Sequence, residues 1–240
     1  MRRAAILAYG VACYLAFVGS FSALALFGWN LGIVRGIDAP PRGSLVIDLA
    51  LLAVFGVSHS VLARPAAKRV ATAMIPEPAE RSTYVLVASA SLALLVWQWR
   101  AQPEVVWHVS TPAVRYAIWA LSGAFSALIV VSTFLTSHFD LFGLRHVWLA
   151  FQGRPYTPVP FVERWVYTRV RHPMMVGVLG WLWLTPDMTV GHLVFSAGMT
   201  AYIFIGVVYE ERGLARSLGA PYEEYRRRVR AFIPFRPIRK

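Results

Sequence analysis

The sequence predicts an all-α integral membrane protein, a polytopic helical bundle of about six spans that ends in a helical hairpin. Of its 240 residues, 57% are hydrophobic and only 15% are charged, whereas soluble domains carry about 25% charged residues. A membrane span needs about 20 predominantly apolar residues, and windows near that length recur along the chain. They cover residues 4–34, 43–63, 82–99, 116–137, 173–186 and 188–209.

In the first half of the chain, the window 4–34 contains no charge and is too long for a cleaved signal peptide, so we expect a retained span. The second window is interrupted only by Asp48 and His59. The following connector, residues 64–84, predicts a short amphipathic helix that ends near Pro76 and Pro78.

In the second half, residues 137–173 are rich in aromatics and prolines, and we expect them to pack against the membrane face. The "TPDM" stretch predicts a tight helical hairpin whose first arm is short for a full crossing. In that arm, Gly177 and Gly180 either permit a close helix approach or face lipid. Residues 210–235 predict a helix, a Gly-Ala-Pro turn and a short basic helix. We divide the single membrane domain into transmembrane helices (1–136) and a loop, hairpin and C-terminal segment (137–240).

The net charge of +12 is distributed by side rather than gathered in one patch. The N-terminus, the 64–81 and 145–171 loops and the tail after 211 hold 20 of the 24 Lys and Arg residues. This asymmetry follows the positive-inside rule and predicts that both termini are cytoplasmic. The bilayer, and not nucleic acid, is therefore the expected partner of the basic charge. The number of copies in the assembly stays open.

Cysteine chemistry contributes little, because Cys13 is the only cysteine and lies inside the first apolar window. A single cysteine cannot form an internal disulfide, a thiolate zinc site or a CxxC redox pair. A metal site would have to come from side chains whose spacing matches no strong template, and we predict none. Those side chains are His59, His138, Asp140 and His146.

Ionisable side chains from four segments are predicted at one membrane depth, on the cytoplasmic side, where intramembrane polar groups tend to mark function. Singly, each has an ordinary alternative: a histidine can cap a helix, and Glu210 or Glu211 can pair with Arg212 or Arg216 on a solvated face. Their convergence favours a site. The set comprises Ser58, His59, His138, Asp140, Arg171, His172, Glu210 and Glu211.

The stretch "RVRHPMMVG" predicts an anion site. Pro173 suits the first turn of a helix, which places His172 at the N-cap beside free backbone N–H groups. Arg171 adds a guanidinium for the same anion. Glu210 and Glu211 are expected at the C-terminal end of the last span, where the helix dipole disfavours negative charge, so they should bind an ammonium or a ribose diol. Together these groups predict a zwitterionic, nucleotide-like ligand.

The ordered set "RVRHPMMVG", hairpin, "EERGLARSLGAPYEEY" and "FIP" resembles the C-terminal signature of the isoprenylcysteine carboxyl methyltransferase and phospholipid methyltransferase superfamily. The resemblance implies that this region binds S-adenosylmethionine at the cytoplasmic membrane face. Met175 stands where the family often has tyrosine. The residues implied to bind the cofactor are Tyr167, Arg171, His172, Pro173, Met175, Glu210, Glu211, Tyr222 and Tyr225.

From about residue 50 onward, "HSVLARPAAKR", "IPEPAERSTYVL", "LLVWQWR" and "TSHFDLFGLRHVWL" resemble the bacterial methanethiol S-methyltransferases, a membrane branch related to NnrU-type proteins. The resemblance implies an inner-membrane enzyme of sulfur metabolism that converts methanethiol, a small volatile thiol, to dimethyl sulfide with S-adenosylmethionine. A thiol with a pKa of about 8.5 or above needs a nearby base. We expect His138 in that role, with Asp140 or His59 orienting it and Ser58 close by.

The sulfonium could be sheltered by aromatic side chains of the 137–173 segment through cation–π contact, although such residues also form interfacial belts. The candidates are Trp148, Tyr156, Trp165 and Tyr167. Two other functions stay open: methylation of a larger lipid or isoprenylcysteine acceptor, and a non-enzymatic role like that of other NnrU-type membrane proteins.

Overall fold

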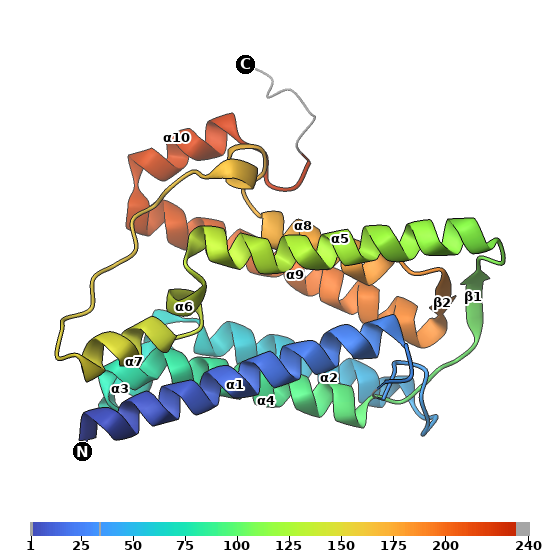
Figure 1. The fold of residues 1–240 in the computed structure, drawn as a ribbon, viewed down its shortest axis with the longest axis horizontal. Coiled ribbons are helices and arrows are strands. Elements are labelled where there is room, and N and C mark those ends of the chain that lie inside the picture. Colours follow the sequence, from blue (N-terminus) through green and yellow to red (C-terminus); the bar gives the residue numbers. More distant parts are fainter. Residues whose placement is uncertain (1, 34, 234–240) are drawn as a thin grey trace. The chain divides into compact units, whose positions relative to one another are not determined.

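The structure is a computed structural model, and it describes residues 2–33 and 35–233. These residues form mostly helices, with two short strands (Figure 1). The elements are α1 (Arg2–Trp29), α2 (Leu45–Leu62), α3 (Pro65–Met74), η1 (Glu77–Ala79), α4 (Glu80–Gln98), β1 (Val105–His108), α5 (Pro112–Thr136), α6 (His138–Leu141), α7 (Leu144–Phe151), η2 (Trp165–Thr168), α8 (Pro173–Trp183), β2 (Asp187–Thr189), α9 (Val190–Leu218) and α10 (Ala220–Arg228).

Within the described residues, five helical segments are long and apolar enough to cross a membrane: α1, α2, η1 with α4, α5 and α9. The hairpin's first arm, α8, has only 11 residues and is short for a crossing, as the sequence predicts. Large apolar side chains on the spans are exposed, including Leu15, Val57 and Ile205. Such surface suits contact with lipid rather than water, and the prediction of a polytopic helical membrane protein is confirmed.

The described residues divide into two compact units, each assembled from three parts of the sequence. Unit 1 draws on residues up to Val106, Ser137–Val159 and Thr189–Phe195, and unit 2 on Trp107–Thr136, Pro160–Met188 and the described residues from Ser196 on.

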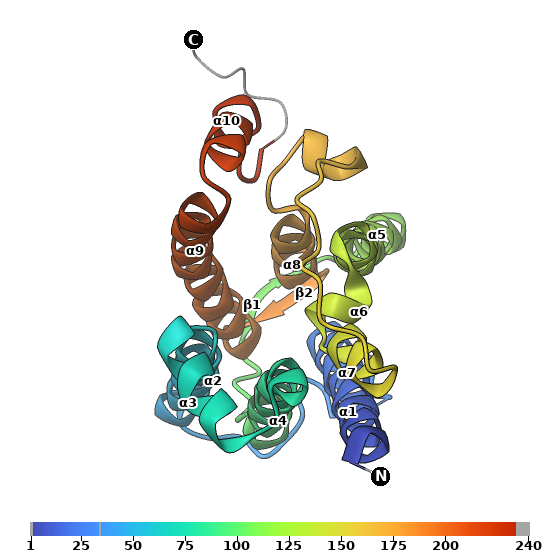
Figure 2. The same ribbon diagram turned by 90° about the vertical axis from the view of Figure 1, so that its left-hand side faces the viewer.

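In unit 1, α4 packs against both α1 and α2, and α7 packs against α1 (Figure 2). Small residues allow the close crossing of α1 and α7, because a Cβ on Gly10 would lie 2.5 Å from Cγ2 of Val147. The carboxylate of Asp48 is fully buried on α2. It accepts hydrogen bonds of 2.8 Å from the backbone N–H of Arg100 and from Nε2 of Gln102, which offsets the cost of burying the carboxylate.

The connector after α2 contains the predicted amphipathic helix, α3, which ends at Met74, just before Pro76. Pro65 occupies the first helical turn, where its missing N–H leaves no hydrogen bond unmade. The short helix η1 follows and leads directly into α4.

In unit 2, α8 packs closely on α5 because of the two glycines in the hairpin arm. A Cβ on Gly177 would lie 2.8 Å from the carbonyl oxygen of Phe125, and one on Gly180 would lie 2.2 Å from Cγ of Phe125. Of the two interpretations that the sequence allows for these glycines, the structure supports the close helix approach. The hydroxyl of Ser196 on α9 donates to the carbonyl oxygen of Leu182 at 2.8 Å and links the two arms of the hairpin.

The hairpin turn contains strand β2, which the sequence analysis does not predict. Arg115 donates to both carboxylate oxygens of Asp187 at 2.9 and 2.7 Å, and Nδ1 of His108 lies 2.6 Å from the same carboxylate. The hydrogen bonds from Arg115, and then the contact with His108, hold the pKa of Asp187 below its usual range.

One expectation for the last span is wrong. The apolar window ends near Tyr209, but α9 continues to Leu218, so Glu210 and Glu211 lie about two turns before the end of the helix. The helix dipole acts mainly within the last turn, and it does not explain these two acids. The predicted Gly-Ala-Pro turn and basic helix are present, as Gly219 with a φ of 64° and α10.

Candidate functional site

The Arg-His-Pro stretch begins helix α8 as predicted. Pro173 is the first helical residue and His172 is the N-cap, with its carbonyl oxygen accepting from the backbone N–H of Val176 at 3.0 Å. The side chain of His172 does not cap the helix, and it is buried, with 6% of the residue exposed. Met175 follows in the same first turn and is partly buried. Because the imidazole of His172 makes no capping hydrogen bond, its polar contacts lie outside α8.

Those contacts are with the glutamates of α9. Nε2 of His172 lies 3.0 Å from Oε1 of Glu211, and Nε of Arg171 donates to the same oxygen at 2.9 Å. Arg171 also donates to the carbonyl oxygens of Arg226, at 3.1 Å, and Val229, at the end of α10. A guanidinium committed to a carboxylate and two carbonyls holds α8, α9 and α10 together.

The two adjacent glutamates have different surroundings. The side chain of Glu211 is 16% exposed and is enclosed by Arg171 and His172. The side chain of Glu210 is 48% exposed, and its carboxylate lies 3.6 Å from Nδ1 of His172. Residues next to each other on a helix point about 100° apart, so Glu211 contacts both Arg171 and His172, whereas Glu210 approaches only His172. The alternative pairing with Arg212 or Arg216 is not observed among the described residues.

The predicted tyrosines stand behind this cluster. Tyr222 and Tyr225 are almost fully buried with Val229, against residues of the last turns of α9. The hydroxyl of Tyr225 donates to the backbone carbonyl of Tyr167 at 2.6 Å. Burial raises the pKa of Tyr222 and that of Tyr167 to about 12, and it also raises the pKa of Tyr225. All three hydroxyls therefore remain protonated at neutral pH. The buried side chains of Tyr222 and Tyr225 hold α10 against the end of α9.

The segment after α10 also contributes to the site, which the sequence analysis misses. The backbone N–H of Arg171 donates to the carbonyl oxygen of Arg230 at 2.8 Å, and that of His172 donates to Ala231 at 3.1 Å. The ring of Phe232 lies 5.9 Å from that of His172. The signal that the sequence offers is the "FIP" stretch at the end of the motif, whose proline, Pro234, lies outside the described residues.

A second group of predicted site residues lies in unit 1 and centres on His138. Its Nε2 lies 2.7 Å from the hydroxyl of Tyr14, and its ring lies edge-on to Phe142 with centroids 4.9 Å apart. From the sequence we expect Asp140 or His59 to orient this ring, and the structure adds Tyr14, which the sequence does not point to, as a hydrogen-bond partner. Burial lowers the pKa of His138, so the imidazole is neutral at pH 7.

Asp140 has partners of its own. Arg145 donates to Oδ1 at 2.8 Å, and the hydroxyl of Tyr156 donates to Oδ2 at 3.2 Å. The ring of His146 stacks on Tyr156 with centroids 4.2 Å apart. Burial lowers the pKa of His146, although the nearby Asp140 carboxylate opposes the shift. This carboxylate organises the loop that leads into and out of α7.

The remaining pair, Ser58 and His59, lies near the end of α2. Nε2 of His59 lies 2.8 Å from the hydroxyl of Tyr84 on α4. The hydroxyl of Ser58 donates to the carbonyl oxygen of Phe55 in its own helix, at 3.1 Å. The hydroxyl of Ser58 is thus used within α2 itself, and His59 links α2 to α4 through Tyr84.

The other candidates differ in exposure. Trp165 and Trp148 are exposed, and Trp148 stacks on Phe151, which suits interfacial belt residues. Across residues 2–33 and 35–233, no group of three or more His, Cys, Asp or Glu side chains is arranged to hold a metal ion.

The fold and these residues define a class: a polytopic helical membrane protein with a buried Arg-His-Glu cluster at the base of a C-terminal helical hairpin. Residues 48–234 match the NnrU protein family, and the chain belongs to that family. No solved structure matches the chain.

Several curated relatives align over most of the chain and carry one name, methanethiol S-methyltransferase. A protein from Mycobacterium tuberculosis is 45% identical over 239 residues, 98% of each chain. One from Crocosphaera subtropica is 41% identical over 98% of this chain and 94% of its own. Methanethiol S-methyltransferase 1 of Bradyrhizobium diazoefficiens is 42% identical over 95% of this chain and 81% of its own. The resemblance inferred from the motifs is confirmed.

Proposed function

We propose that the protein is an integral membrane methyltransferase that moves a methyl group from S-adenosylmethionine to methanethiol and so forms dimethyl sulfide. The observation that carries the proposal is the alignment, at 45% identity over 98% of both chains, with a relative named for this activity. The buried cluster of unit 2 supports it, because all of its members belong to the motif that suggested a methyl-donor site.

The side chains of unit 2 fit the polar ends of such a methyl donor. S-adenosylmethionine carries a carboxylate, an ammonium and a ribose diol, and supplies a methyl group on a positively charged sulfur. Because Glu211 already occupies the guanidinium of Arg171, the carboxylate is better matched to the backbone N–H groups in the first turn of α8, including that of Met175. Glu210, which is half exposed, then accepts from the ammonium or the diol.

Under this proposal Arg171 and Glu211 do not contact the ligand; they position the residues that do. They fix the start of α8 and the position of His172, and a fixed binding surface favours the near-attack geometry that a methyl displacement requires. His172 contacts the ligand from the N-cap. Tyr222 and Tyr225 keep α10 seated behind the cluster.

We assign thiol activation to His138. A thiol with a pKa of about 8.5 or above is mostly protonated at neutral pH, and the neutral imidazole of His138 can accept its proton. The 2.7 Å contact with Tyr14 holds one ring nitrogen and fixes the ring's orientation. Asp140, His59 and Ser58 are assigned to the support of this region, since each is engaged by other neighbours.

The distribution of Lys and Arg supports a site on the cytoplasmic face of the bacterial inner membrane, with both termini in the cytoplasm.

The test is a methyl-transfer assay on the purified full chain in detergent, with S-adenosylmethionine and methanethiol, that follows dimethyl sulfide in the headspace and S-adenosylhomocysteine in solution. We expect both products in equal amounts. A parallel arm replaces methanethiol with an isoprenylated cysteine or a phospholipid amine. Methylation of those acceptors alone would favour the larger-acceptor function, and no transfer to any acceptor would leave only a non-enzymatic role.

A further inference from the structure

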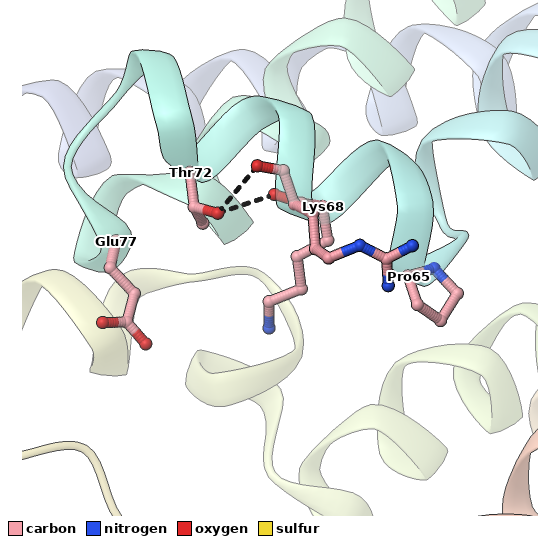
Figure 3. Close-up of a pocket in the computed structure, with 5 residues that line it drawn as sticks. Pro65, Lys68, Thr72 and Glu77 are labelled. Carbon is pink, nitrogen blue, oxygen red and sulfur yellow. Dashed lines mark hydrogen bonds between the residues drawn. The ribbon is translucent and has the colours of Figure 1, made fainter.

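Helix α3 carries a groove that the proposed reaction does not use. The groove has a volume of about 410 Å³ and is lined by Pro65, Lys68, Arg69, Thr72 and Glu77 (Figure 3). Pro65, Lys68 and Thr72 recur at intervals of three and four residues, so they share one face of the helix. Glu77 joins them from the start of η1.

Another face of α3 is apolar and exposed. Val70 and Met74, four residues apart, are 64% and 82% exposed. Ala67 and Ala71 are half-buried, so α3 packs against the rest of unit 1 along a narrow strip of small residues. A short helix with one apolar and one charged face is typical of a helix that lies in the membrane interface.

The chain path supports that location. Helix α2, a candidate span, ends at Leu62, and the next candidate span begins at Glu77. Since α3 connects two neighbouring spans over a few residues at each end, it lies at the surface of the bilayer. Val70 and Met74 can then enter the acyl boundary, while the groove stays at the level of the lipid headgroups.

The groove contains charges of both signs. Lys68 is 3.5 Å from the carboxylate of Glu80, and among the described residues no acidic side chain pairs with Arg69. Figure 3 shows the side chains of Lys68 and Glu77 extending in the same direction in this view. Arg64 precedes the helix as its N-cap and does not line the groove. The groove therefore offers Arg69 and Lys68, the latter shared with Glu80, beside the carboxylate of Glu77.

We propose that this groove binds the headgroup of a phospholipid that has a primary ammonium, of the phosphatidylethanolamine type. Lys68 and Arg69 bind the phosphodiester, and Glu77 accepts from the ammonium. Phosphatidylcholine has a quaternary ammonium that cannot donate a hydrogen bond, and phosphatidylglycerol has no cation for Glu77. The site belongs to unit 1 and is independent of the proposed methyl transfer.

The experiment is native mass spectrometry of the purified full chain, titrated with phosphatidylethanolamine, phosphatidylcholine or phosphatidylglycerol of identical acyl chains. We expect one site that prefers phosphatidylethanolamine over each of the others by about two- to fivefold, the range for an exposed ion pair. Glu77→Gln should lower phosphatidylethanolamine binding to the level of phosphatidylcholine and leave phosphatidylcholine binding unchanged.

Charge-matched controls separate the groove from general charge effects. Lys68→Gln with Arg69→Gln should weaken binding of all three lipids, whereas Arg154→Gln with Arg216→Gln should not. Glu104→Gln is the control for Glu77→Gln. Thermal unfolding in the same detergent verifies that each variant is folded.

Three outcomes would overturn the proposal. The first is tighter binding of phosphatidylglycerol than of phosphatidylethanolamine by the wild type. The second is stronger or unchanged phosphatidylethanolamine binding in Glu77→Gln, and the third is an equal loss in the groove variant and its arginine control.

Discussion

Replacing Glu211 with glutamine tests whether the Arg-His-Glu cluster is a structural clamp. The change keeps the shape of the side chain and one carbonyl acceptor, but it removes the negative charge between Arg171 and His172, which lie 2.9 and 3.0 Å from one oxygen. Hydrogen bonds to charged groups contribute about 1.5–3 kcal/mol each. Because the amide retains a neutral acceptor and Arg171 keeps two backbone carbonyls, we expect a loss of about 2 kcal/mol in unfolding free energy.

For a chain of 240 residues, that loss corresponds to a fall in Tm of about 4–8 °C. The matched control is Glu210→Gln, the same substitution one residue earlier. The carboxylate of Glu210 is half exposed and 3.6 Å from His172, and even a full ion pair at an exposed position contributes only about 0–1 kcal/mol. Its Tm should therefore change little, while its affinity for the methyl donor falls.

The assay pairs thermal unfolding of the purified protein in detergent with calorimetric titration of S-adenosylmethionine. The reasoning predicts that Glu211→Gln mainly loses stability and Glu210→Gln mainly loses methyl-donor affinity. If Glu210→Gln lowers Tm as much as Glu211→Gln, the assignment of a structural acid and a ligand-facing acid is refuted. A Glu211→Gln protein with unchanged Tm would refute the clamp itself.

Further predictions concern the two histidines and the hairpin. His172→Ala should weaken methyl-donor binding. His138→Ala should leave the Kd for the methyl donor nearly unchanged and lower kcat by about 10²-fold or more. An equal Kd in wild type and His172→Ala, measured by the same titration, would contradict the assignment of His172 to methyl-donor binding. Since the pKa of His138 lies below its ordinary value, the imidazole gains its proton only at more acidic pH, and kcat/KM should fall on the acid side with a midpoint below about 6.5. A pH–rate profile checks this, and His138→Ala should abolish that limb. Gly177→Ala should lower the unfolding free energy by about 1–3 kcal/mol because its Cβ would lie 2.8 Å from the carbonyl oxygen of Phe125; Gly206→Ala, with nothing within 4 Å, should be neutral or slightly stabilising in the same thermal assay.

Much of the architecture follows from hydropathy and from proline and glycine. Apolar windows locate the spans, Pro173 marks the start of α8, and Gly219 separates α9 from α10. Hydropathy reports where the membrane ends and not where a helix ends. For that reason α9 runs past Glu211 to Leu218, and the dipole argument made from the sequence is wrong.

Side-chain partners were harder to predict, because they depend on the packing of distant segments. Tyr14 lies 124 positions before His138 and has no motif that links it to that histidine. The two short strands, β1 and β2, have four and three residues, too few for an alternating pattern to stand out. The Arg171–Glu211 pair joins two motif residues whose charges were assigned to different parts of a ligand.

That pair changes how the motif is interpreted. A motif with Arg171 and two successive glutamates suggests three ligand-binding charges, but the helix lets only one glutamate face Arg171 and His172. Glu211 meets them, and Glu210 remains half exposed. The Arg-His-Pro and Glu-Glu motifs therefore depend on each other structurally, because Arg171 and His172 both contact Glu211, and this dependence does not require a ligand. Ligand recognition then rests on fewer groups: Glu210, His172 and the N–H groups of the first turn of α8. A chain that kept Arg171 and Glu211 but lacked an acid at 210 should fold and still fail to hold the methyl donor.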